Sequence, residues 1–162
     1  MSLLLLSGSM GFVCLGFLPF NMPKARVFMG DVGSILLGFV YAGLVVGLSH
    51  SLNDFVVLCS FLFPFYADEL TTEYVRLRDG ESLLKPHRRH VYQLLANEMG
   101  IAHWKVSVGY GVVQLIVGVS FIYVKGYGFS ILLSMLTFYF VAFAVAGYYI
   151  RSAVAADLRS AP

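Results

Sequence analysis

Residues 23–34 read PKARVFMGDVGS and form a short polar passage between two long apolar runs. Asp31 lies at its centre, between Gly30 and the sequence Val-Gly-Ser. Glycines let a backbone approach a phosphate closely, and a carboxylate can hold a hard cation such as Mg²⁺. The residues alone leave two interpretations of Asp31 open. It is a magnesium ligand at a membrane surface, or a carboxylate that stabilises the first turn of the following helix.

The apolar runs around this passage indicate a membrane protein. The chain has 162 residues, of which 59% are hydrophobic and 12% charged, and its mean hydropathy is +0.80. Soluble domains carry about twice that charged share. We therefore predict an all-α, polytopic membrane protein with about five transmembrane helices, forming a single membrane domain over residues 1–162. The five apolar runs lie at residues 3–18, 35–48, 55–67, 106–124 and 129–150.

Local signals predict where several of these helices begin and end. Ser34 is a candidate N-cap of the second run, and Pro64 predicts a kink or break near the end of the third. Residues 68–105 are the longest polar segment. Within it we expect a helix over residues 68–78, ended by an Asp-Gly pair, and a short amphipathic helix over residues 91–97.

The distribution of basic residues predicts the orientation in the membrane. Only Lys125 falls in the turn between the last two runs, whereas the other ten Lys and Arg residues fall in the passage 19–34, the segment 68–105 and the C-terminal tail. An excess of Lys and Arg marks the cytoplasmic side. We therefore expect residues 68–105 to form a cytoplasmic loop, and Asp31 to face the same compartment as that loop. The basic residues concerned are Lys24, Arg26, Arg76, Arg78, Lys85, Arg88, Arg89, Lys105, Arg151 and Arg159.

A second polar passage, His87-Arg88-Arg89-His90, lies within the predicted loop. One interpretation is a basic patch that attracts anionic lipid headgroups. A second is phosphate recognition, in which arginine forks bind phosphate oxygens and the histidines donate hydrogen bonds or protons near neutral pH. A third is a metal site made by the two histidines. Asp68 and Glu69 are interpreted as an acidic helix start, with Arg76 and Arg78 as partners of these acids or of a phosphate.

These motifs, taken in order, resemble the polyprenyl-phosphate N-acetylhexosamine-1-phosphate transferases of glycosyl transferase family 4. The motifs that carry the resemblance are FMGDVGS at residues 28–34, Asp68, the arginines at 76 and 78, Gly80, and HRRHVYQ at residues 87–93. The HRRH sequence resembles the branch that initiates O-antigen synthesis more than the peptidoglycan branch, which carries a run of consecutive histidines. The resemblance through motifs covers residues 19–98.

The resemblance implies a reaction and a place for it. A sugar-1-phosphate would move from a UDP-N-acetylhexosamine to undecaprenyl phosphate, with Mg²⁺, releasing UMP at the cytoplasmic face of a bacterial inner membrane. The product would serve cell-envelope polysaccharide synthesis, such as that of O-antigen lipopolysaccharide, and no nucleic acid would be involved. Asp31 would be the magnesium ligand and, with His87 and His90, a catalytic residue. The implied substrate-binding residues are Arg88, Arg89, Gly30, Gly33, Ser34 and Asp68.

The resemblance also implies a longer protein. Family members carry, in their earlier half, an adjacent pair of aspartates and an Asn/Asp-Gly loop that help to form the same site. This chain contains no Asp-Asp pair. We therefore expect the C-terminal half of such a transferase, incomplete by itself, working with a separate N-terminal half or as a homodimer. The alternative is a non-catalytic membrane protein that binds anionic lipid or a partner through its basic cytoplasmic loop.

Overall fold

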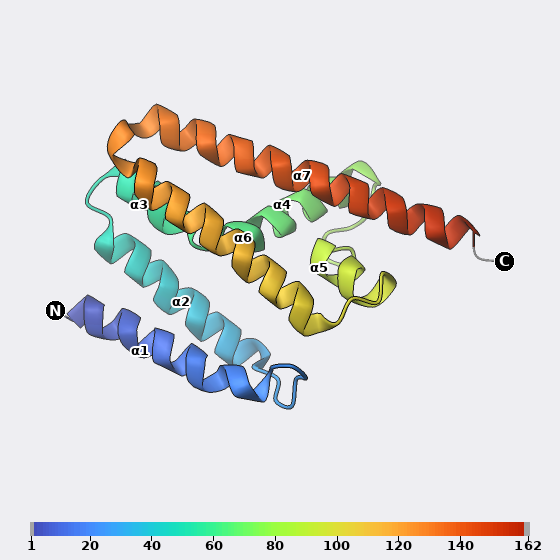
Figure 1. The fold of residues 1–162 in the computed structure, drawn as a ribbon, viewed down its shortest axis with the longest axis horizontal. Helices are drawn as coiled ribbons and strands as arrows, with labels where there is room; N and C mark the ends of the chain where they lie inside the picture. Colours follow the sequence, from blue (N-terminus) through green and yellow to red (C-terminus); the bar gives the residue numbers. More distant parts are fainter. Residues whose placement is uncertain (1, 161–162) are drawn as a thin grey trace. The chain divides into compact units, whose positions relative to one another are not determined.

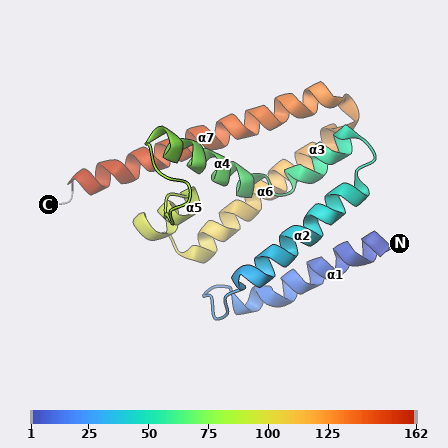
Figure 2. The same cartoon turned by 180° about the vertical axis from the view of Figure 1, so that it is seen from behind.

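A computed structural model describes residues 2–160, and the side chains of residues 158–160, including Arg159, lie outside the description. Residues 2–160 form helices joined by turns, with no strand among them, so the predicted all-α class is confirmed (Figures 1 and 2). The chain divides into two compact units, Met1–Cys59 and Ser60–Pro162.

The number of membrane spans agrees with the sequence. Four helical segments of the described chain are long and apolar enough to cross a membrane, and a broken pair of helices makes a fifth. The prediction of about five transmembrane helices is therefore confirmed. The four segments are Ser2–Phe20, Gly30–Leu48, His103–Tyr127 and Phe129–Asp157, and the broken pair is Leu52–Ser60 with Phe63–Arg78.

The first unit is built from two antiparallel helices. Helix α1 (Ser2–Phe17) continues into the 3₁₀ turn η1 (Leu18–Phe20), and α2 (Gly30–Leu48) returns alongside α1 (Figure 1). The Tyr41 hydroxyl of α2 donates a hydrogen bond to the carbonyl of Leu58 in α3 (Leu52–Ser60). This bond fastens α3 to α2.

The start of α2 differs from the prediction, because Ser34 is not its cap. Helix α2 begins at Gly30, and the Ser34 hydroxyl lies inside the first turn, where it donates to the carbonyl of Asp31 at 3.1 Å. Gly30 has φ +65°, a left-handed conformation that a residue with a Cβ adopts only with strain. The helix therefore begins at this glycine, five residues before the start that a Ser34 cap predicts.

The third apolar run is broken, as Pro64 predicted. Helix α3 ends at Ser60, and α4 (Phe63–Arg78) begins with Pro64 in its first turn, where the missing N–H costs no helical hydrogen bond. Helix α4 then continues to Arg78 and ends at Asp79, with Gly80 at φ +75°. The prediction that a helix starts at Asp68 is wrong, because Asp68 lies inside α4.

The second unit packs α4 against two long antiparallel helices. These are α6 (His103–Val124) and α7 (Phe129–Ser160), joined by η3 (Lys125–Tyr127), and α4 contacts both (Figure 2). Phe63, at the start of α4, is buried, and its ring centroid lies 5.9 Å from that of Tyr139 on α7. Aromatic packing of this kind holds the three helices together.

The second unit contains a short helix that the sequence predicted and a helical extension that it did not. Helix α5 (Val91–Gln93) continues into the π-helical turn η2 (Leu94–Glu98), which confirms a short helix in this region. Helix α7 runs past residue 150 to Ser160, so the expected polar tail is helical. This extension brings Arg151 against α4.

Replacing Gly118 with alanine tests the packing of α6. A Cβ on Gly118 would lie 2.9 Å from two carbons of the Phe61 ring, whereas a Cβ on Gly111 would meet no atom within 4 Å. We expect Gly118→Ala to destabilise the protein by about 1–3 kcal/mol through overpacking. Thermal unfolding in detergent measures this loss. Gly111→Ala is the matched control and should keep or raise the Tm by its better helix propensity. Equal Tm values for the two variants would contradict the packing.

Candidate functional site

Asp31 lies exposed in the first turn of α2. No side-chain or backbone group in residues 2–160 forms a hydrogen bond or ion pair with its carboxylate. Asp54 also lies in the first turn of its helix, α3, but its carboxylate accepts bonds from the His50 N–H at 3.2 Å and the Ser51 hydroxyl at 2.8 Å. Of these two acids at helix starts, Asp31 is the one whose carboxylate is available to a cation.

The carboxylate of Asp68 is buried, with 3% of the residue exposed, and is surrounded by hydrogen-bond donors. Its Oδ1 accepts from the Val91 N–H at 2.8 Å and the Thr72 hydroxyl at 3.2 Å. Its Oδ2 accepts from the Tyr110 hydroxyl at 2.7 Å and the Tyr92 N–H at 3.2 Å. Four donors satisfy the buried charge, which would otherwise be costly to desolvate.

This set of bonds connects four helices around one side chain. The donors of Asp68 come from α4, α5 and α6, and Thr72 also accepts a bond from Arg151 of α7 at 2.8 Å. Two of the donors are the first two backbone N–H groups of α5. Asp68 therefore fixes the point at which the chain leaves the His-Arg passage.

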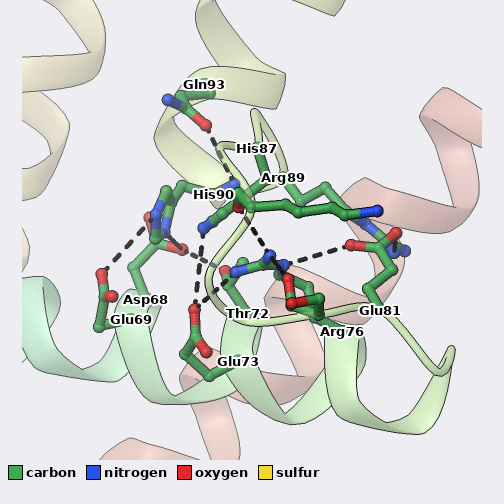
Figure 3. A network of polar contacts seen from close by, with 12 residues as sticks. Asp68, Glu69, Thr72, Glu73, Arg76, Glu81, His87, Arg89, His90 and Gln93 are labelled. Carbon is green, nitrogen blue, oxygen red and sulfur yellow. Dashed lines mark hydrogen bonds and ion pairs between the residues drawn. The ribbon is translucent and has the colours of Figure 1, made fainter.

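The two histidines of the passage face acids of α4 (Figure 3). The ring centroids of His87 and His90 lie 4.8 Å apart. His90 places Nδ1 at 3.7 Å from Oδ1 of Asp68 and Nε2 at 3.7 Å from Oε2 of Glu69. His87 places Nε2 at 3.7 Å from Oε1 of Glu73, and its buried Nδ1 makes no hydrogen bond. The pair is thus held over a row of carboxylates spaced along one face of α4.

The surroundings of His87 favour its neutral form. Burial lowers the pKa of His87 below its ordinary value, and the charges of Arg76 and His90 lower it further, while Glu73 opposes them. A neutral imidazole at pH 7 can accept a proton or donate a hydrogen bond. His87 is therefore available as a hydrogen-bond donor or acceptor without carrying a charge.

Arg76 clamps the loop that carries the passage. It is 1% exposed, and its guanidinium donates to Glu73 at 3.0 Å, Glu81 at 3.2 Å, the Ser82 carbonyl at 2.6 Å and the Lys85 carbonyl at 3.0 Å (Figure 3). These four bonds engage the guanidinium of Arg76 with groups of the protein itself. The structure therefore gives Arg76 neither the acids first considered as its partners nor access to a phosphate.

The two arginines of the passage differ in their availability. Arg89 donates to Asp79 and Glu81, each at 2.6 Å, whereas exposed Arg88 has no ion pair or hydrogen bond among the described residues. The bond from Arg89 lowers the pKa of Asp79. Burial acts to raise the pKa of Glu81, but bonds from Arg89 and Arg76 outweigh it, and that pKa is also lowered. Arg88 is the arginine that can meet a ligand without breaking an existing pair.

A cleft of about 460 Å³ opens beside this network. It combines two acids of α4 and His90 of the passage with residues of α6. Within the described residues no group of three or more His, Cys, Asp and Glu is arranged to hold a metal. His87 and His90 therefore lack a third ligand, and a metal site built on them gains no support. The polar residues lining the cleft are Asp68, Glu69, His90, Tyr92, His103, Ser107 and Tyr110.

The predicted site residues fall into two groups, one in each unit. Gly30, Asp31, Gly33 and Ser34 share the first turns of α2, where a Cβ on Gly33 would collide with the Met29 side chain. The second unit brings together Asp68 and residues 87–90. The expectation that both groups face one compartment stays a prediction, as do the individual roles.

Sequence reasoning missed three residues of the network. Thr72 and Tyr110 bond Asp68 directly, from 4 and 42 residues further along the chain. Arg151 bonds Thr72 and lies 79 residues beyond it. Tyr110 looked like part of an apolar span and Arg151 like part of a tail. A polar group within an apolar helix was the signal that could have marked them.

The fold is that of a polytopic α-helical membrane protein, and comparison with known proteins shows which family it resembles. Residues 1–49, which include Asp31, match the model of glycosyl transferase family 4. The phospho-N-acetylmuramoyl-pentapeptide-transferase of Limosilactobacillus fermentum (strain NBRC 3956 / LMG 18251) is 32% identical over 105 residues, 64% of this chain and 31% of that protein. The protein of the same name from Staphylococcus aureus (strain JH9) is 31% identical over 107 residues, 66% of this chain and 32% of its own length.

These matches confirm the resemblance to glycosyl transferase family 4 that the motifs predicted. The aligned region spans less than a third of the length of each of these relatives. No solved structure matches the chain.

Replacing Asp68 with asparagine tests its hold on α5. The amide keeps the size of the side chain but turns one acceptor oxygen into a donor, which leaves buried N–H or O–H groups unpaired. We expect a loss of about 1–3 kcal/mol and exchange of the Val91 and Tyr92 amides that is about tenfold faster or more. Hydrogen exchange with mass spectrometry measures both amides. Glu69→Gln, next to it and largely exposed, is the control. Unchanged exchange in the Asp68 variant would refute the anchoring role.

The lowered pKa of His87 predicts a pH dependence of stability. Below pH about 6.5 the unfolded chain gains a proton at this histidine that the folded protein does not. The stability should therefore fall as the pH drops from 6.5 toward the pKa of His87 in the folded state. NMR titration of histidine-labelled protein gives the pKa, and His87→Gln identifies the resonance and should flatten the dependence. A pKa at or above 6.5 would contradict the electrostatics described.

Proposed function

We propose that the chain forms part of a phosphotransferase that moves a sugar-1-phosphate from a UDP-sugar to a polyprenyl phosphate, releasing UMP. One observation carries the proposal. The segment that matches glycosyl transferase family 4 contains Asp31, and the Asp31 carboxylate is exposed and unpaired at a helix start. A structural acid at such a position forms local bonds, as Asp54 does.

The chemistry of Asp31 fits Mg²⁺. This ion is usually held by one or two carboxylates and completes its shell with water and substrate phosphates, so a single available carboxylate is a sufficient protein contribution. When bound, Mg²⁺ neutralises the charge of a diphosphate during phosphoryl transfer. Gly30, Gly33 and Ser34 surround the acid with small residues at the positive end of the α2 dipole, which favours an approaching phosphate.

The second unit would supply the donors. Phosphoryl transfer depends mainly on positioning and on neutralising charge, so fixed cationic and hydrogen-bonding groups suit it. Arg88 has free donors, and His87 and His90 are held over α4 beside the cleft. In this proposal Asp68 contributes to substrate binding by fixing the passage, because its own oxygens already accept four bonds.

The substrates and the setting are the finer part of the proposal. We assign a UDP-N-acetylhexosamine as donor and undecaprenyl phosphate as acceptor, at the cytoplasmic face of a bacterial inner membrane. The HRRH sequence favours the O-antigen branch, although the two relatives reported above are both named phospho-N-acetylmuramoyl-pentapeptide-transferase. Further acids of the site would come from a separate N-terminal half or from a second copy of this chain.

Co-expression with the N-terminal half of a family member tests the proposal. Membranes given Mg²⁺, undecaprenyl phosphate and labelled UDP-N-acetylglucosamine should form a lipid-linked sugar diphosphate and release UMP. We expect Asp31→Asn to lower the rate about 100-fold or more, because a lost metal ligand removes several kcal/mol of charge stabilisation. Chelation of Mg²⁺ should have the same effect. Asp54→Asn, the other aspartate at a helix start in this unit, should remain active. Full activity of the Asp31 variant would exclude the role assigned to it.

A further inference from the structure

A second cleft, of about 510 Å³, lies between α4 and α7 in the second unit. Neither His87 nor His90 lines it, so it is distinct from the cleft beside the histidines. Three arginines line it, and they come from the end of α4, the loop and α7. We call it the arginine cleft, defined by Arg78, Arg89 and Arg151.

The charges of the arginine cleft are only partly balanced. Arg78 is 64% exposed, and its nearest carboxylate oxygen, on Asp79, lies 3.7 Å away. Arg151 forms no ion pair with any described residue. It donates a hydrogen bond to the neutral Thr72 hydroxyl, and its buried Nε has no hydrogen-bond partner among the described residues. Arg89 shares Asp79 with Arg78 and also bonds Glu81. Three guanidinium groups therefore face a cleft whose lining contains one carboxylate, which favours an anion.

The position of the cleft indicates where that anion comes from. Arg151 lies near the end of the candidate span Phe129–Asp157, and Arg78 is the last residue of the broken span. Tyr74 and Tyr148 line the same cleft and are exposed, and tyrosines of this kind gather at the boundary between membrane and water. This position, at the ends of two candidate spans, favours the phosphate of a lipid headgroup over a soluble phosphate.

We propose that the arginine cleft binds the phosphate headgroup of an anionic membrane phospholipid. Basic pockets between transmembrane helices hold such headgroups. Forked guanidinium groups pair with two phosphate oxygens, and the Ser152 hydroxyl lines the cleft as a further donor. The site needs no transferase activity and does not rest on the proposed function. It places lipid recognition between α4 and α7 instead of on the exposed Arg88 of the loop.

Native mass spectrometry of the full chain tests this site. The protein, in neutral detergent, is titrated with phosphatidylglycerol and, separately, with phosphatidylcholine. We expect tighter binding of phosphatidylglycerol, weakened roughly fivefold by Arg78→Gln and by Arg151→Gln. Lys105→Gln removes an exposed charge of the same unit outside the cleft and should change binding little. Equal affinities for the two lipids, or equal effects of the three variants, would overturn the proposal.

Two further measurements distinguish a lipid headgroup from a soluble phosphate, and a forked guanidinium contact from charge alone. Inorganic phosphate at millimolar concentration should not displace phosphatidylglycerol, and displacement would assign the cleft to a soluble phosphate and overturn the lipid site. Arg78→Lys keeps the charge but loses the fork, so it should bind more weakly than the unchanged protein and more tightly than Arg78→Gln. Arg78 is exposed, so its variants remain informative even where Arg151→Gln lowers the Tm through the lost bond to Thr72.

Discussion

The arrangement of the second unit depends on one buried carboxylate. A carboxylate at 3% exposure is tolerated only where donors replace water, and Asp68 has four of them. The donors come from three helices, so none of these helices can shift without leaving a buried charge partly unpaired. The same carboxylate holds the first N–H groups of α5. One interaction therefore fixes both the packing of these helices and the end of the His-Arg passage that leads into α5.

A second buried charge holds the loop from its other side. Arg76 bonds the carbonyls of Ser82 and Lys85, and Asp68 bonds the N–H groups of Val91 and Tyr92. The passage at residues 87–90 lies between these two anchors. The loop has no regular structure before α5, so its shape comes from these side chains rather than from a backbone ladder. Histidines held in this way need little reordering when a ligand binds, which favours affinity.

The features that could be predicted from the sequence are those set by neighbours in the chain. The apolar runs, the break at Pro64 and the end of α4 at Gly80 each follow from local composition or backbone geometry. The failures involve partners outside the local segment or an overlooked conformation. From the sequence Asp68 is interpreted as a helix start, because its bonds to Tyr110 and α5 are not visible in the local sequence. Arg151 is assigned to a polar tail, because its partner Thr72 lies 79 residues away. Ser34 failed as a cap because a left-handed Gly30 had already started the helix.

Several acids of this chain differ from Asp31 in one property, which is that their carboxylate oxygens already accept hydrogen bonds from the protein. Asp68, Asp79 and Glu81 accept bonds from the groups that build the second unit, and Asp54 closes a turn of α3. An acid with its acceptors filled serves the fold, since a ligand would have to displace an existing donor. Asp31 has no such donor, and the positive end of α2 stabilises its charge without occupying its lone pairs. Saturation of hydrogen bonds, rather than residue type or exposure alone, therefore separates Asp31 from Asp54, Asp68, Asp79 and Glu81.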